Sequence, residues 1–185
     1  SDYRRLMPLD ALSEADRADF LDTWSQGHRI ERNGTNAGLV LNNGWTLPIP
    51  IVRSGEGWVF DVRAGAEEIR IRRIGRNELA TIKTMYAFYD AQREYAEQDR
   101  NDDGVREYAR RFVSRPGKHD GLYWATPEGE PPSPAGPLFD AGKRKDGYHG
   151  YRFKILEAQG PAANGGARNY LSRGRLVNGF ALVAW

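Results

Sequence analysis

Apolar residues near the start of the chain recur at helical spacing. They fall on one face of a helix predicted over residues 12–27: Phe20, Leu21 and Trp24. Ser13 is a suitable N-cap, and Asp16 stands three residues later, where a capping box places its acidic residue. Gly27 is suited to ending the helix. The pattern therefore predicts one short amphipathic helix in this part of the chain.

Short apolar runs separated by turn signals follow this helix. They cover residues 37–41, 45–53 and 58–62. Asn43-Gly44 is a strong hairpin signal, and glycines mark a second turn between the last two runs. Pro48 and Pro50 interrupt the middle run, which therefore belongs at a sheet edge or is irregular. These runs predict an antiparallel β-meander.

Residues 67–98 form the longest periodic segment, with apolar side chains three and four positions apart. The spacing predicts an amphipathic helix with a wide apolar face. Gly75 either kinks this helix or divides it into two. A broad apolar face is most simply explained as ordinary core, and a ligand-binding role is the alternative.

The remainder of the chain mixes helical, loop and strand patterns. Residues 104–113 predict a shorter helix, and the Pro- and Gly-rich stretch 114–147 predicts a long loop. Strands are expected over residues 148–156, 170–177 and 180–185. The fold class is therefore α+β: an N-terminal helix plus antiparallel β-meander in residues 1–65, then a long amphipathic helix packed on an antiparallel sheet in residues 66–185. The long helix is shared across the boundary.

Composition excludes several classes of protein. The chain has 185 residues, no cysteine and a formal net charge of only +2. Disulfides, Cys-ligated zinc and thiol nucleophiles are therefore excluded. The arginines of residues 70–76 lie between Glu67 and Glu68 on one side and Glu78 on the other, which is not the one-sided basic surface of a nucleic-acid-binding protein. No apolar run has the length of a transmembrane helix.

The acidic stretch 99–107 resembles the first part of an EF-hand calcium loop. Oxygen-bearing or carbonyl ligands occur at alternate positions: Asp99, Asn101, Asp103, Val105 and Glu107. Calcium takes six to eight oxygen ligands, and Gly104 permits the tight turn that makes them converge. Position 12 of the pattern is Arg110 instead of the bidentate Glu. The segment is therefore either a calcium-stabilised loop or a solvated turn that caps the following helix.

Catalytic motifs are not found. The histidines His28, His119 and His149 lack metal-binding spacing, and there is no nucleophile elbow or phosphate-binding glycine loop. We therefore expect a non-enzymatic protein. A hydrolase with dispersed residues around His119 and Asp120 is an alternative that would require a nucleophile within hydrogen-bonding reach.

Two surfaces are candidates for binding. The apolar strand 180–185 would expose unpaired backbone groups if it lay at a sheet edge, with Phe180, Leu182 and Ala184 at the interface. It would pair with another protein or with missing segments of its own chain. The competing hypothesis is a small-ligand or peptide pocket between the meander and the long helix, lined by Trp45, Trp58 and Tyr89.

Several longer stretches are similar to a known bacterial family. They are Gly57–Asp61, Gly75–Leu79, Asp90–Ala96, Pro116–Trp124, Gly129–Pro134, Tyr148–Phe153 and Asn178–Trp185. In this order they resemble the "domain of unknown function 2950" family over nearly the whole chain, most strongly over residues 45–185. The family has no established activity, so the resemblance transfers no catalytic residue.

The resemblance implies a location and an incomplete chain. Members of the family are secreted or periplasmic, begin before the residue corresponding to Ser1 and continue with further strands. The chain is therefore expected to be part of a longer periplasmic or extracellular protein. Weaker similarities are to pilin-like and pseudopilin headgroups in the C-terminal part, and to NTF2-like domains in the N-terminal part. Together they suggest a structural or interaction module of a surface assembly.

Overall fold

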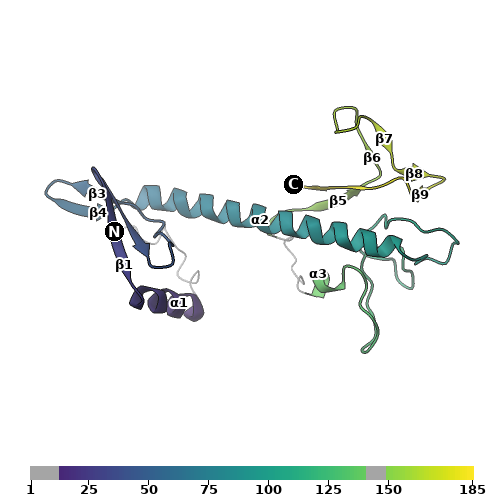
Figure 1. Ribbon diagram of the computed structural model, residues 1–185, viewed down its shortest axis with the longest axis horizontal. Helices are drawn as coiled ribbons and strands as arrows, with labels where there is room; N and C mark the ends of the chain where they lie inside the picture. Colours follow the sequence, from purple (N-terminus) through teal and green to yellow (C-terminus); the bar gives the residue numbers. More distant parts are fainter. Residues whose placement is uncertain (1–12, 141–148) are drawn as a thin grey trace. The chain divides into compact units, whose positions relative to one another are not determined.

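The computed structural model describes residues 13–140 and 149–185 and has an α+β fold (Figure 1). Its helices are α1 (Glu14–Ser25), α2 (Val62–Ala96) and α3 (Gly136–Asp140). Its strands are β1 (His28–Asn33), β2 (Asn36–Leu41), β3 (Ile51–Ser54), β4 (Gly57–Phe60), β5 (Phe153–Leu156), β6 (Ala158–Gln159), β7 (Arg168–Asn169), β8 (Leu171–Ser172), β9 (Arg175–Leu176) and β10 (Ala181–Ala184). All of the strand pairs are antiparallel.

The chain divides into two compact units, Ser1–Arg76 and Asn77–Trp185. The boundary lies inside α2, which begins in the first unit and ends in the second. Sequence analysis expected units of 1–65 and 66–185 with the long helix shared between them.

Helix α1 of the first unit begins at the predicted capping box. The Ser13 hydroxyl accepts a hydrogen bond from the Asp16 N–H at 3.1 Å, and the Asp16 carboxylate accepts one from the Ser13 N–H at 3.1 Å. These bonds satisfy two backbone donors that a helix start otherwise leaves free. Gly27, just after the helix, has φ +136°, which favours glycine.

A four-stranded antiparallel sheet in the order β1-β2-β3-β4 follows α1. Strand β1 was not predicted, because every one of its residues is exposed and its sequence carries no apolar alternation. It exists through its backbone pairing with β2, whose Leu39, Val40 and Leu41 are buried. The middle strand of the predicted meander is shorter than expected. Regular pairing starts at Ile51, since the prolines before it lack the N–H that a ladder needs.

Helix α2 is continuous through Gly75, so the long helix was predicted and, of the two alternatives for Gly75, the division into two helices is wrong. It begins at Val62, five residues before the predicted start. The Asp61 carboxylate accepts a hydrogen bond from the Ala64 N–H at 2.9 Å, which caps this earlier start.

The helix predicted over residues 104–113 is also wrong, because tertiary hydrogen bonds occupy the backbone groups that it would need. The Tyr108 N–H donates to the Leu176 carbonyl at 2.8 Å. Both backbone groups of Ala109 bond to the Gln92 side chain, each at 2.8 Å. A backbone N–H bound in this way is not available to a carbonyl four residues earlier.

The second unit contains the C-terminal part of α2 and three small antiparallel ribbons: β5 with β10, β6 with β7, and β8 with β9. Ring contacts join α2 to the first of these ribbons, since Phe88 lies against Phe153 of β5. The predicted strand 170–177 is instead the tight β8–β9 hairpin, turning at Arg173 and Gly174, which have φ of +51° and +79°. The hydrophobic core of the second unit contains Phe88, Ala91, Tyr95, Ala109, Leu122, Ala135, Ile155, Tyr170 and Leu176. The beginning of the predicted strand 148–156 lies outside the described residues, and regular pairing covers Phe153–Leu156.

Candidate functional site

Strand β10 has one paired edge in the described part of the chain. Its partner is β5, with Leu182 opposite Ile155 and Ala184 opposite Phe153. Trp185 and Arg152 exchange both backbone hydrogen bonds, at 2.9 and 3.1 Å. Because hydrogen-bonded and non-hydrogen-bonded pairs alternate in an antiparallel ladder, the N–H and C=O of Leu182 and Ala184 point away from β5. These groups form the open edge of β10.

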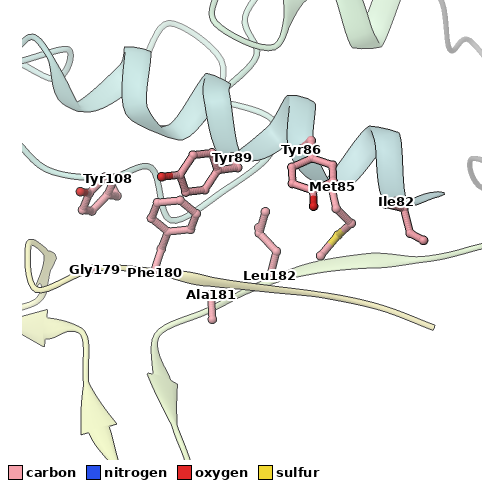
Figure 2. Close-up of a pocket in the computed structure, with 9 residues that line it drawn as sticks. All are labelled: Ile82, Met85, Tyr86, Tyr89, Tyr108, Gly179, Phe180, Ala181 and Leu182. Carbon is pink, nitrogen blue, oxygen red and sulfur yellow. The ribbon is translucent and has the colours of Figure 1, made fainter. Parts of the chain in front are cut away.

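The side chains of β10 alternate between two faces. Figure 2 shows Phe180 and Leu182 directed toward α2, and Ala181 directed away from it. Phe180 lies against Tyr89 of α2, with ring centroids 5.8 Å apart, and against Tyr108 at 4.9 Å. Since opposite residues share a face, Phe153 and Ile155 of β5 belong to the helix-facing side as well.

A groove of about 670 Å³ lies between this face of β10 and α2 (Figure 2). Its lining residues are Ile82, Met85, Tyr86, Tyr89, Tyr108, Gly179, Phe180, Ala181 and Leu182. Carbon atoms dominate the lining, and the polar groups of its side chains are the tyrosine hydroxyls. The groove belongs entirely to the second unit.

The exposure of the α2 side chains rises steadily around the helix from β5 toward the groove. Phe88 packs on Phe153 of β5, with ring centroids 5.5 Å apart, and is 6% exposed. At ~100° per residue, Tyr89, Ile82 and Tyr86 lie about 100°, 120° and 160° around the axis from Phe88. They are 46%, 51% and 68% exposed. The helix therefore continues its apolar surface beyond the part that β5 and β10 cover.

Two buried side chains of α2, Gln92 and Tyr95, form hydrogen bonds to the segment that follows the helix, and this segment contains Tyr108 of the groove. The Gln92 side chain, fully buried, bonds to both backbone groups of Ala109, next to Tyr108. The Tyr95 hydroxyl donates to the His119 carbonyl at 2.6 Å. Burial of Tyr95, with the nearby Glu107 and Asp120 carboxylates, raises the pKa of this phenol, so the hydroxyl stays a donor.

The acidic loop is stabilised by its own hydrogen bonds. The Asp99 carboxylate accepts from the N–H groups of Asp103 and Gly104, at 3.2 and 2.7 Å. The Gly104 bond in particular lowers the pKa of the Asp99 carboxyl, although partial desolvation acts in the opposite direction.

The remaining predicted calcium ligands have bonds of their own in this loop. Asp103 accepts from the Val105 N–H at 3.0 Å and pairs with Arg175 at 2.9 Å. The Asn101 amide donates to the Glu107 carboxylate at 2.6 Å. Among residues 13–140 and 149–185 there is no group of at least three His, Asp or Glu side chains placed to hold a metal ion. Calcium binding here stays a prediction.

Among residues 13–140 and 149–185, the side chains of His119 and Asp120 make no hydrogen bond to a nucleophilic side chain. The exposed His119 ring stacks on Trp124, with centroids 4.4 Å apart, and makes no hydrogen bond within the described residues. Asp120 accepts from the Arg115 N–H at 2.9 Å and from its guanidinium at 2.6 Å, and lies 3.8 Å from Arg111. Partial burial alone would raise the pKa of Asp120, but these bonds and charges outweigh it and lower the pKa.

The predicted aromatic pocket residues fall in different units. Trp45 and Trp58 belong to the first unit, where Trp45 packs edge-on against Phe20 at 5.9 Å and Arg32 lies 5.6 Å from the Trp58 ring. Tyr89 belongs to the second unit and lines the groove. The predicted interface strand also reaches it, since Phe180 and Leu182 line the groove and Ala184 contributes to the open edge.

The other helix residues in the groove are Ile82, Met85 and Tyr86. They belong to the apolar face predicted over residues 67–98, for which ordinary core was the simplest explanation, but they line an open groove. The available signal was the width of the apolar face, which a wide apolar stripe on a helix presents for contact. Tyr108 carried no such signal, because its position depends on a long-range backbone bond to Leu176.

Comparisons with known proteins place the chain in one family. In the part of the chain that the structure describes, no helix is both long and apolar enough to cross a membrane. No curated protein and no solved structure matches the chain significantly, so the pilin-like similarity is not supported. A family model matches residues 1–185, the whole chain. The chain therefore belongs to the family described as protein of unknown function (DUF2950).

Proposed function

We propose that the second unit is a non-enzymatic interaction module that binds an extended segment of another polypeptide as an added strand on β10. The observation that carries this proposal is the open edge of β10 beside an apolar groove. The N–H and C=O groups of Leu182 and Ala184 pair with no strand among residues 13–140 and 149–185, and they would supply main-chain hydrogen bonds. The groove would receive every second side chain of the segment. This is the arrangement of β-strand addition.

The composition of β10 supports an added strand. From Phe180 to Trp185 every residue is apolar, and each residue of the strand itself is only half-buried. Strands that are apolar on both faces are typical of the interior of a sheet, whereas edge strands usually carry lysine, proline or a bulge that prevents further pairing. β10 has none of these protections, so it has the character of an interior strand.

The exposed helix residues supply a driving force. Ile82 and Tyr86 are 51% and 68% exposed, and a strand on the open edge of β10 would lie against them. Full burial of a large apolar side chain stabilises by about 1.5–3 kcal/mol, so the remaining exposure is worth about 1 kcal/mol for each residue. Main-chain hydrogen bonds then decide the alignment of the bound segment.

A small-molecule ligand fits the groove less well than an extended chain does. Small-ligand sites enclose most of the ligand and place several polar groups around it. Here one wall consists of exposed helix side chains, and the tyrosine hydroxyls are the polar groups of the lining side chains. An extended segment, which brings its own backbone hydrogen bonds, is the better match.

A peptide-display selection with the purified chain tests the proposal. Selected peptides are expected to bind in extended form, and Leu182→Lys should weaken them at least roughly tenfold by placing a charge in the groove. Val59→Lys is the matched control, because Val59 is an exposed apolar strand residue of the first unit, 49% exposed. Equal loss in both variants, or helical bound peptides, would contradict the proposal. A dimer that Leu182→Lys dissociates would replace it with self-association.

We also propose that the protein works outside the cytoplasm, as part of a surface assembly. The support is the resemblance to secreted or periplasmic proteins of the same family. Fractionation of cells that express the full-length protein tests this location. Recovery of the protein with cytoplasmic markers would contradict it.

A further inference from the structure

We propose that the segment bound by β10 is an acidic amphipathic strand, with apolar side chains over the groove and carboxylates at the alternate positions. This inference rests on the proposed function and specifies the chemistry of its partner. It follows from which residues of β10 direct their backbone N–H and C=O groups away from β5, and from the charges on the face of the β5–β10 ribbon that is turned away from α2.

The open edge determines which residues of the partner enter the groove. Leu182 and Ala184 direct their backbone groups outward, and the Leu182 side chain faces α2 (Figure 2). In an antiparallel ladder, residues that form a hydrogen-bonded pair also share a face. The partner residues that bond to Leu182 and Ala184 therefore lay their side chains over the groove, against Ile82 and Tyr86.

The opposite face of the ribbon is cationic on β5. Arg152 and Lys154 belong to it, opposite Trp185 and Val183 of β10. Both are exposed, and neither has an ion-pair partner among residues 13–140 and 149–185. The side chains that share this face on the two strands are apolar or basic, so none of them is acidic.

A carboxylate on the added strand can reach these cations. The added strand would lie two inter-strand spacings from β5, or about 10 Å. On this face, Val183 of β10 lies between Lys154 of β5 and the added strand. The Val183 side chain is short enough for a Glu side chain of the added strand to meet the Lys154 side chain above it. Partner residues between the groove positions are therefore favoured when they are acidic.

The same argument disfavours a second copy of β10 as the occupant. In an antiparallel pair of β10 strands, the residues next to the cationic face would be Ala181, Val183 and Trp185 of the other copy. None of their side chains is acidic. The charge of β5 would then have no partner, so the geometry selects a different polypeptide.

Synthetic peptides that alternate Val with Glu, long enough to span β10, test the inference against peptides that alternate Val with Lys. The Glu peptide is expected to bind roughly tenfold more tightly at low salt, and the difference should shrink as salt screens the charges. Lys154→Glu should reverse the preference. Lys118→Glu, an exposed lysine in a loop of the same unit, is the matched control and should leave it nearly unchanged.

N-methylation of the peptide separates the inference from the proposed function. Methylation at Val positions should abolish binding, because those N–H groups bond to β10, whereas methylation at Glu positions should be tolerated. If the Glu and Lys peptides bind equally tightly, and methylation abolishes binding only at the Val positions, the acidic specificity is overturned and strand addition is left intact. If neither peptide binds, or if methylation at the two kinds of position has the same effect, the proposed function itself is overturned.

Discussion

Replacing Gln92 by alanine tests whether one buried amide holds α2 to the segment that follows it. Gln92 is 0% exposed, and its amide bonds to the carbonyl and the N–H of Ala109, each at 2.8 Å. Ala109 is itself 1% exposed, so water does not replace these bonds readily. The substitution leaves two backbone groups buried without partners.

The expected cost is large for a single residue. Each buried backbone group that loses its partner costs about 1–3 kcal/mol. Lost packing of the side chain adds to this, so we expect Gln92→Ala to lower the free energy of unfolding by about 3–5 kcal/mol. A typical domain has about 5–15 kcal/mol in total. Gln98→Ala is the control, because Gln98 is an exposed glutamine just beyond the end of α2, and it should cost less than about 0.5 kcal/mol.

Urea unfolding, with hydrogen exchange of the Leu122 amide, measures the effect in the second unit. This amide bonds to the Arg111 carbonyl at 3.0 Å and reports the same packed segment. A loss below about 1 kcal/mol for Gln92→Ala would refute the reasoning, because two buried orphan groups cannot cost so little.

Gln92→Glu supplies a second readout if the alanine variant does not fold. Burial should raise the folded-state pKa of the introduced carboxyl, and in its neutral form it can donate to the Ala109 carbonyl. Stability should therefore be highest below the unfolded-state pKa and fall as the pH rises through the folded-state pKa. A pH-independent deficit would contradict this account.

The remaining predictions concern the helix cap, an acidic group and the loop. Ser13→Ala removes the hydrogen bond to the Asp16 N–H and should destabilise α1 by about 1 kcal/mol, seen as faster exchange of its amides with little change in the second unit. The pKa of Asp120 is lowered in the folded state, so its stabilising contribution is present above its unfolded pKa and is lost as the pH falls through the folded value. Acid unfolding of Asp120→Asn should therefore show less pH dependence than the wild type, and an unchanged profile would contradict the assignment. If residues 99–107 bind calcium, excess calcium should raise the melting temperature relative to chelator, and Asp103→Ala should abolish the rise. An unchanged melting temperature would leave the loop as an internally bonded turn.

Local signals in the sequence were sufficient where the structure depends on neighbouring residues. The capping box at Ser13, the apolar period of the long helix and the turn before Trp45 are all set within a few positions. The EF-hand-like spacing of residues 99–107 is also local, and it forms a tight turn in which Asp99 bonds to the backbone. Such features depend on bonds between residues that are close along the chain.

Pairing partners and tertiary bonds account for two of the failures. β1 has no apolar pattern and forms because the adjacent β2 offers it a backbone ladder. The expected helix over residues 104–113 is lost to bonds with Gln92 and Leu176, which lie far away in the sequence. Neither choice can be read from local propensity. The third failure is local: residues 170–177 form a hairpin instead of one strand, because Arg173 and Gly174 adopt positive φ and Gly174 is a turn signal.

The sequence by itself determined which side chains are apolar, and therefore that α2 has a wide apolar stripe and that the segment from Phe180 to Trp185 is a strand suited to burial. Only the tertiary structure decided that these two features meet. It placed β5 on one edge of β10, directed Leu182 and Ala184 to the other edge, and left Ile82 and Tyr86 partly uncovered. The physical reason is that apolar character is a property of each residue, whereas exposure depends on how many neighbours the fold brings to it.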